Sequence, residues 1–426
     1  MHGGELGRMG PHGWSSGLAG LVLSLGLVLP ACGSERDEAR ATGGAGGRDA
    51  GASGTGGGAG AGAREGGTSV DAGDASPPTP GWPHGCTGAE CGQATALSAG
   101  YSHICVVSAD RRVVCFGAND RGQLGRMTSD QSPFSDFEPM AVAGLGNVSE
   151  VAAGGDVTWA LTSDGKLYRW GAHFGNSDFT DPLLIGSVSP VEMTAVHDVR
   201  RIVAGASGAC GMTSAGGVRC WGNNECGELG VDSNNVHLAD VPGVASVADL
   251  VLDESAVCAR HMDGKISCWG AIAEAGAFVC AREPVTSIQG IPEARALASF
   301  RNRSCSLDAG GAVTCFNPPP GCGSLDPCGP ERYVPAKLPE LQGATRLLAD
   351  DSDVCGVFGD KTLRCVRQDY DFANNRWQTI VYDVPGVLDA RAFGRGQNRT
   401  CALDGAGFVF CWNEPGDQPY PLALLP

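Results

Sequence analysis

The sequence is poor in basic residues. Its 426 residues include 30 Lys and Arg against 47 Asp and Glu, which gives a formal net charge of -17, and only 18% of the chain is charged. Such a chain repels phosphate backbones and other polyanions on average, so nucleic acid is not expected as its main partner. The length suffices for one large domain with extensions.

Long apolar stretches are equally scarce. Only residues 18–29 form a nearly continuous apolar run, and no later stretch stays apolar for 18 residues, so no second membrane segment is expected. The run at 18–29 is short for a membrane span and lies where the apolar region of a signal peptide belongs. The sequence therefore predicts a signal peptide over residues 1–31.

The end of this run carries a short motif. Leu29-Pro30-Ala31-Cys32 resembles a bacterial lipobox, in which small residues admit the peptidase and the cysteine thiol receives a lipid. The resemblance implies that Cys32 is the lipidated N-terminus of a mature cell-envelope protein, on the outer membrane or cell surface or in the periplasm. Secretion without a lipid is the alternative.

The next segment has hardly any large apolar side chain. From Gly33 to about Pro80 it consists mainly of Gly, Ala, Ser and Thr, which cannot bury enough surface to offset the entropy of ordering. A random coil of about 50 residues reaches roughly 40 Å. We therefore expect a flexible tether over residues 32–95, with a small loop closed by Cys86 and Cys91.

Helical periodicity is absent beyond residue 95. Short β-rich runs such as Val113-Val114-Cys115-Phe116 alternate with Gly, Asn and Asp turns. Self-comparison gives seven copies of one pattern, 46 to 54 residues apart, and this period predicts the blades of a propeller. The reference positions of the copies are Cys105, Trp159, Cys210, Cys258, Cys305, Cys355 and Cys401.

A second, opposing position follows each reference position by ten residues. The opposing residues are Cys115, Arg169, Cys220, Cys268, Cys315, Cys365 and Cys411, so six copies carry a Cys pair. Five copies place Gly six residues after the reference position, as a three-residue hairpin loop with a left-handed glycine requires: Gly165, Gly216, Gly264, Gly311 and Gly407. Opposed residues have Cα atoms about 4.5–5.5 Å apart, which a disulfide can span. Six hairpin disulfides are predicted.

The residues after the opposing position carry a family resemblance. Copies one and three read Cys115-Phe116-Gly117-Ala118-Asn119-Asp120-Arg121-Gly122-Gln123-Leu124-Gly125 and Cys220-Trp221-Gly222-Asn223-Asn224-Glu225-Cys226-Gly227-Glu228-Leu229-Gly230. These resemble the W-G-x-N-x-x-G-Q-L-G stretch of regulator-of-chromosome-condensation repeats. The resemblance implies an all-β, seven-bladed propeller over residues 96–426. Copies five and six depart from it, with Phe316-Asn317 and Val366-Arg367 in place of Trp-Gly.

The 19 cysteines are too many for reduced thiols in a cytosolic protein of this size, so they favour an oxidising compartment. Six remain after Cys32 and the hairpin pairs. We pair Cys86 with Cys91, Cys322 with Cys328, and Cys226 with Cys280. Zinc is the rival interpretation, but no C-x-x-C pair exists.

Candidate site residues are few. No histidine forms a dyad with a nucleophile by spacing alone, and His103, two residues before Cys105, is expected to be structural. The turns that lead into the reference strands vary, and their charges form a candidate protein-binding face: Asp253, Glu254, Arg301, Arg303, Asp350, Asp351, Asp353, Arg395 and Arg399. Ordinary solvated turns are the alternative, as is calcium at the three Asp of copy six. The Pro-rich insertion at 317–330, with Cys322 and Cys328, is a second candidate recognition element.

Three functions are compatible with this reading. The first is a non-catalytic, monomeric, envelope-anchored scaffold that binds an unknown protein and uses no cofactor. A secreted inhibitory propeller that resembles this family likewise acts by protein recognition alone. The second is a hydrolase or lyase with a site over the central channel. The third is guanine-nucleotide exchange, which the family resemblance implies but which an exported chain could not perform on a cytosolic GTPase. How the ring closes, near Ala96 and Leu424, is left open.

Overall fold

In the computed structural model, all of the described residues belong to one compact unit, Ser76–Pro426. The structure describes the following residues: 92–127, 135–172, 186–206, 208–233, 236–253, 256–274, 277–300, 303–317, 334–350, 352–371, 376–396 and 399–424. The predicted signal peptide, Cys32, the tether with Cys86 and Cys91, and the loop of Cys322 and Cys328 lie outside these residues. Within them, no helix is long and apolar enough to cross a membrane.

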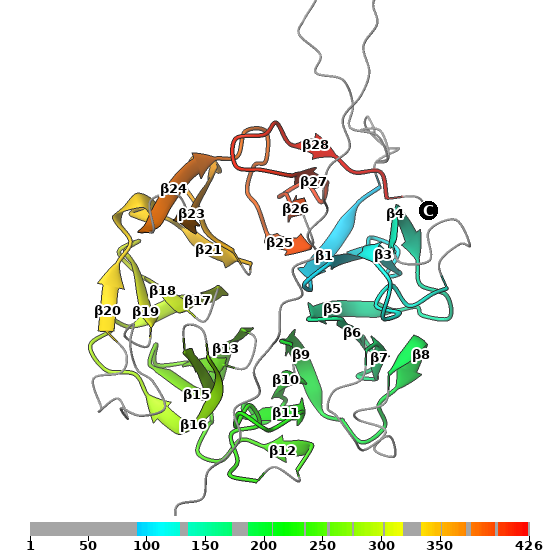
Figure 1. Ribbon diagram of the computed structural model, residues 1–426, viewed down its shortest axis with the longest axis horizontal. Helices are drawn as coiled ribbons and strands as arrows, with labels where there is room; N and C mark the ends of the chain where they lie inside the picture. Colours follow the sequence, from blue (N-terminus) through cyan, green and yellow to red (C-terminus); the bar gives the residue numbers. More distant parts are fainter. Residues whose placement is uncertain are drawn as a thin grey trace, which may run out of the picture. The chain divides into compact units, whose positions relative to one another are not determined.

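Seven four-stranded antiparallel sheets, the blades, form a ring (Figure 1), which confirms the predicted seven-bladed propeller. Blade 1 contains β1 (Ala94–Ala99), β2 (His103–Ser108), β3 (Val113–Ala118) and β4 (Ser135–Ala141). Blade 2 contains β5 (Val148–Gly154), β6 (Val157–Thr162), β7 (Leu167–Gly171) and β8 (Ser187–Glu192). Blade 3 contains β9 (Val199–Ala204), β10 (Gly208–Thr213), β11 (Val218–Gly222) and β12 (Leu238–Asp240).

The remaining four blades follow the same plan. Blade 4 contains β13 (Val247–Asp253), β14 (Ala256–His261), β15 (Ile266–Glu274) and β16 (Ala277–Ser287). Blade 5 contains β17 (Ala294–Phe300), β18 (Arg303–Asp308), β19 (Val313–Asn317) and β20 (Val334–Lys337), and the 3-10 turn η2 (Pro339–Leu341) leads on from it. Blade 6 contains β21 (Arg346–Ala349), β22 (Asp353–Val357), β23 (Leu363–Asp371) and β24 (Arg376–Asp383). Blade 7 contains β25 (Ala392–Gly396), β26 (Arg399–Leu403), β27 (Val409–Trp412) and β28 (Tyr420–Pro421).

Each blade uses four consecutive strands, with the first strand nearest the ring axis (Figure 1). This order gives the ring two different faces. The turns from first to second strand and the connections from third to fourth strand lie on one face, which we call the turn face. The hairpins from second to third strand and the links between blades lie on the other, the hairpin face.

The ring closes without a shared sheet. The first strand β1 pairs only with β2, and the last strand β28 only with β27, so the two ends of the chain do not complete one blade. Instead, the Ala94 N–H donates to the Gly407 carbonyl oxygen at 2.8 Å, and Leu97 packs in one core cluster with Leu422 and Leu424. Side-chain packing between blades 1 and 7 therefore joins the ends.

The six predicted hairpin disulfides are confirmed. They bond Cys105–Cys115, Cys210–Cys220, Cys258–Cys268, Cys305–Cys315, Cys355–Cys365 and Cys401–Cys411. Each joins directly opposed residues of the second and third strands. Their Cα–Cα distances of 3.9 to 4.2 Å are shorter than those of ordinary opposed residues, because the bond draws the two strands together.

The hairpin loops also have the predicted left-handed residue. The five glycines six residues after the reference positions have φ between 77° and 93°. Blades 1 and 6 have Arg111 (φ 64°) and Lys361 (φ 72°) at this place instead. The loop geometry is therefore retained even where no glycine supplies it, at a steric cost that the paired strands must offset.

The glycine-rich motif of copies one and three links neighbouring blades. The carbonyl oxygen of Gln123 in blade 1 accepts hydrogen bonds from the Trp170 indole and the Thr158 hydroxyl of blade 2, both at 2.9 Å. The carbonyl oxygen of Glu228 in blade 3 accepts the Trp269 indole of blade 4 at 3.0 Å in the same way. The motif thus connects neighbouring blades through hydrogen bonds.

Blade 2 has a tryptophan–arginine pair in place of a disulfide. Trp159 and Arg169 are directly opposed, and the guanidinium lies 5.6 Å from the Trp159 ring centroid. The Trp159 ring also meets Trp221 of blade 3 edge to face, with centroids 5.6 Å apart. A cation–π contact and a shared aromatic core therefore replace the missing covalent bond.

Candidate functional site

A cavity of about 340 Å³ lies on the ring axis. The first strands of all seven blades contribute to its lining, which includes Leu97, Val151, Leu250, Leu297, Leu347 and Phe393. Cavities of this size are at the small end of those that hold organic ligands. The cavity is therefore the candidate site that the ring itself builds.

One layer of the cavity wall is formed by the residue six positions before each reference position. In six blades this residue is small or aliphatic: Ala99, Ala153, Ala204, Leu252, Ser299 and Ala349. In blade 7 it is Arg395, whose side chain is 16% exposed. One guanidinium therefore stands in an otherwise small and mainly apolar layer.

A second charged group lies nearer the hairpin face. Glu150 of β5 accepts a hydrogen bond from the Ile202 N–H of blade 3 at 3.0 Å, and burial raises the pKa of Glu150 to about 7 despite the nearby Arg201. Arg201 in turn forms an ion pair with Asp249 of blade 4 at 3.2 Å. These side chains connect blades 2, 3 and 4 around the axis.

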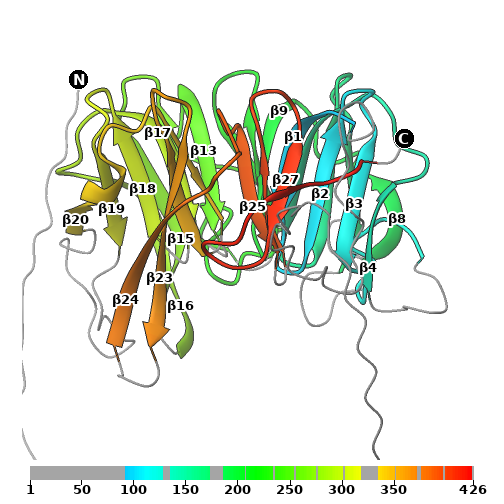
Figure 2. The ribbon, with the colours of Figure 1, turned by 90° about the horizontal axis from the view of Figure 1, so that it is seen from above.

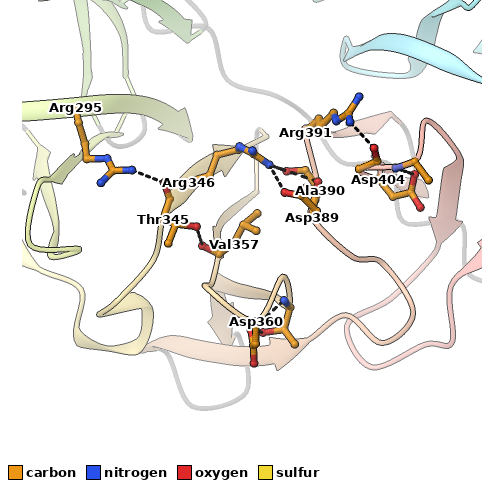
Figure 3. Close-up of polar contacts among 12 residues, drawn as sticks. Arg295, Thr345, Arg346, Val357, Asp360, Asp389, Ala390, Arg391 and Asp404 are labelled. Carbon is orange, nitrogen blue, oxygen red and sulfur yellow. Dashed lines mark hydrogen bonds and ion pairs between the residues drawn. The ribbon is translucent and has the colours of Figure 1, made fainter.

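Arginines make similar links between blades 5, 6 and 7 (Figure 3). Arg295 donates to the Thr345 carbonyl oxygen of the next blade at 3.0 Å. Arg346 donates to the Ala390 carbonyl oxygen at 2.6 Å and to Asp389 Oδ1 at 3.0 Å. Because these guanidinium groups donate hydrogen bonds to the next blade, their main role is to hold neighbouring blades together.

The structure separates the nine residues of the predicted charged face. Glu254, Arg301 and Asp351, and the side chain of Asp253, lie outside the described part of the structure. Arg303, Asp350 and Arg395 are partly buried on the turn face. Asp353 and Arg399 are buried, so these two side chains do not present charge to solvent. The predicted protein-binding face therefore does not include Asp353 or Arg399, and for the other residues it stays a prediction.

The reason for the burial of Asp353 is its partner. Arg367, at the Gly position of the Trp-Gly pair, lies directly opposite Asp353 and donates two hydrogen bonds to its carboxylate at 3.0 and 2.7 Å. Arg367 also lies 3.6 Å from Glu414 Oε2 of blade 7, and Glu414 Oε1 lies 3.9 Å from Arg395 Nη2. A row of alternating charges therefore runs from blade 6 to the axial cavity.

His103 is structural, as expected. It is fully buried, and burial lowers its pKa to about 3, so it is neutral. Its Nε2 lies 2.8 Å from the Thr158 hydroxyl, which donates its own proton to the Gln123 carbonyl oxygen. Nε2 must therefore carry the hydrogen, and the imidazole is fixed between blades 1 and 2.

Two long hairpins stand out from the turn face (Figure 2). They are β15–β16 of blade 4 and β23–β24 of blade 6, and we call them the ribbons. In β23 the pairing with β24 runs without interruption from Arg364 to Asp371. Arg367 takes the place of Gly117, Gly171 and Gly222, which have φ between 101° and 118°. The ribbon of blade 4 keeps a glycine at this position, Gly270, with φ 94°.

Several of these residues were not predicted from the sequence. Glu150, Arg201, Arg367 and Glu414 come from positions whose neighbours are known only once the blades are placed side by side. Among the described residues, no group of three or more His, Cys, Asp or Glu could hold a metal ion. Cys226 is disulfide-bonded, but its partner lies outside the described side chains, so its pairing with Cys280 stays a prediction.

Comparison with known families agrees with this architecture. The family described as "Regulator of chromosome condensation (RCC1) repeat" matches residues 94–123 and 199–228 with one model and residues 112–161 with another. These matches lie in blades 1 to 3, where the repeat motif is best kept. The chain therefore carries regulator-of-chromosome-condensation repeats in blades 1 to 3 of a seven-bladed propeller.

Curated proteins with such repeats are similar over part of their length. The mouse regulator of chromosome condensation is 33% identical over 134 residues, which cover 31% of this chain and 31% of that protein. The fission-yeast (Schizosaccharomyces pombe) protein pim1 is 24% identical over 196 residues, or 41% of this chain and 36% of pim1. The human probable E3 ubiquitin-protein ligase HERC3 is 31% identical over 140 residues, which are 13% of HERC3. The matched regions thus span little more than a third of each relative at most.

Two solved structures show a similar fold. Prp20p from Saccharomyces cerevisiae, a structure described with its binding to Gsp1p and histones, has a TM-score of 0.56 at 18% identity and covers 71% of this chain and 80% of that one. Human WBSCR16 also has a TM-score of 0.56, at 17% identity, and covers 71% and 85%. At these identities the likeness concerns the fold.

Proposed function

We propose that the protein is a non-catalytic scaffold of the bacterial cell envelope that binds another protein through its turn face. A propeller with these repeats fits a protein-binding role. The observation that carries the proposal is the pair of ribbons, which stand out from the turn face of a rigid, disulfide-bonded ring (Figure 2). Recognition elements commonly project from a rigid scaffold in this way.

The cysteine chemistry supports a location outside the cytosol. Six buried disulfides require an oxidising compartment to form and persist. Together with the apolar run at 18–29 and the lipobox-like Leu29-Pro30-Ala31-Cys32, they favour export and lipidation at Cys32. The glycine-rich tether would then hold the propeller away from the membrane, as a monomer.

Guanine-nucleotide exchange is the function that the family resemblance suggests most directly. An oxidised, exported propeller would not meet a cytosolic GTPase, so we do not propose it here. Hydrolase or lyase chemistry over the central channel is also not proposed. Two described histidines contact a hydroxyl: His103, which is buried and neutral, contacts Thr158 at 2.8 Å, and His261 contacts Ser267 at 2.9 Å. The second pair lies in the β14–β15 hairpin, and neither of its residues lines the axial cavity.

Photo-crosslinking in the producing cell tests the proposal. A photoreactive amino acid is placed at exposed Thr379 on the blade 6 ribbon, and the matched control is placed at exposed Asp360 on the hairpin face. We expect a discrete crosslinked protein from position 379 and none from position 360. The same crosslinks from both positions, or none from position 379 and several other ribbon sites, would contradict binding through the turn face.

A further inference from the structure

The described residues around the Arg395 guanidinium supply few hydrogen-bond acceptors. Its side chain is 16% exposed, and its Nη1 is buried with no hydrogen-bond partner in the described part of the chain. Its nearest acidic atom is Glu414 Oε1, 3.9 Å from Nη2, which is beyond hydrogen-bond distance. Burying a guanidinium without a full set of hydrogen-bond acceptors lowers the stability of the folded protein. An acceptor supplied by a bound ligand would remove this cost.

Two carboxylates near Arg395 accept hydrogen bonds from other groups. Asp353 is fully buried and accepts both hydrogen bonds of the Arg367 pair. Asp350, which lines the cavity, accepts the backbone N–H groups of Ser352 and Asp353 on its Oδ1, each at 2.7 Å. Glu414 is 65% exposed and is shared between Arg367 and Arg395 at distances that give a weak contact with each. It is the one carboxylate of this row that can move away into solvent.

The cavity beside Arg395 determines what could replace Glu414. Its volume of about 340 Å³ admits a small organic group, and the same layer is lined by Ala99, Ala153 and Ala204. The planar fork of an arginine matches the two oxygens of a carboxylate. A ligand with a carboxylate at one end and a short aliphatic body would satisfy both parts of the site.

We propose that the axial cavity is a carboxylate-binding site in which Arg395 holds the ligand. The ligand carboxylate lies beside the Arg395 guanidinium on its cavity side, in competition with Glu414 for the same charge, and the body of the ligand rests on the small residues of the cavity wall. The same chemistry can come from a free small acid or from the C-terminal carboxylate of a peptide. The proposal does not depend on the scaffold function, because it concerns the isolated propeller.

Calorimetric titration of the purified, oxidised protein tests the site. The probes are acetate, succinate and citrate as free acids, and trialanine with a free or an amidated C-terminus. We expect at least one free carboxylate to bind. Binding by succinate or citrate identifies a free acid, whereas binding only by trialanine with a free C-terminus identifies a peptide end. Absence of binding by every probe at millimolar concentration would overturn the proposal.

Variants locate the binding in the cavity. Arg395→Leu, which copies the leucine of blade 4 at the same position, should weaken binding by about 10- to 100-fold, the loss expected for a hydrogen-bonded charged group. Glu414→Gln should strengthen it, because the competing charge is removed. The matched control Arg364→Ala removes a guanidinium from the outer side of blade 6, where it pairs with Asp383, and should leave affinity unchanged. Equal affinity of the wild type and Arg395→Leu, or weaker binding by Glu414→Gln, would contradict the assignment.

Discussion

At the scale of single residues, the notable feature of the ring is the set of buried or partly buried charged side chains near its axis. Glu150 near the hairpin face and the row from Asp353 to Arg395 on the turn face each bring ionisable groups into partly dry surroundings. Such groups change the stability of the protein with pH and with substitution. Two predictions follow from their contacts.

The first concerns the pH dependence of stability through Glu150. Burial raises the pKa of Glu150 from its ordinary value of 4.5 to about 7 in the folded protein, so the folded state binds the proton more tightly than the unfolded state between these values. The contribution of this group is therefore fully present below about pH 4.5 and is lost as the pH rises through about 7. Glu150→Gln, which keeps a hydrogen-bond acceptor for Ile202, should lack this dependence.

The measurement is the free energy of unfolding of both proteins by urea between pH 4.5 and 8. We expect the wild type to lose stability relative to Glu150→Gln as the pH rises across this window. A constant difference between the two proteins would show that Glu150 titrates alike in the folded and unfolded states.

The second concerns the buried ion pair of Asp353 and Arg367. Removing one partner leaves the other charge buried, so Asp353→Val or Arg367→Met alone should lower the free energy of unfolding by about 3–5 kcal/mol. The double variant should be more stable than either single variant, because no unpaired charge remains. Urea unfolding of the wild type, the two single variants and the double variant gives the coupling energy between the two residues. If the double variant lost the sum of the two single losses in free energy of unfolding, the result would contradict a tight ion pair.

At the scale of secondary-structure elements, the second and third strands of each blade form the unit that the sequence specified best. The ten-residue spacing of the cysteines, the left-handed loop residue and the opposed pairing were all predictable, because they depend on residues close in sequence. The ribbon of blade 6 was not, since Val366-Arg367 only looked like a degraded Trp-Gly. The strand pairing shows that β23 continues past Arg367 to Asp371.

The hairpin disulfides give a prediction at this scale. Each closes a ring of the same length, so replacing both cysteines of a pair by alanine should lower the apparent free energy of unfolding by about 2–3 kcal/mol in any blade. The variants Cys105→Ala with Cys115→Ala and Cys401→Ala with Cys411→Ala can be compared by denaturant unfolding. A protein that fails to fold without one pair would show that the bonds create the blade rather than stabilise it.

At the scale of the whole molecule, the sequence repeat predicted the ring but not the side-chain contacts in its interior. Seven copies at a period near 50 residues predicted seven blades, whereas the meeting of Glu150 with Ile202, and of Arg367 with Glu414, depends on contacts between blades. Arg395 did leave a signal: aligning the seven copies shows one arginine among small or aliphatic residues at one position. Its meaning came only with the axial cavity.

The central claim is that this propeller works outside the cytosol in an oxidised, membrane-tethered form. Its most direct test is the mass of the mature protein, measured before and after reduction and alkylation, in the membrane fraction of a bacterium that expresses the whole chain. We predict cleavage after Ala31, a lipid on Cys32, and 18 remaining cysteines that react only after reduction. An unprocessed cytosolic chain with reactive thiols would contradict the claim and make guanine-nucleotide exchange the better hypothesis.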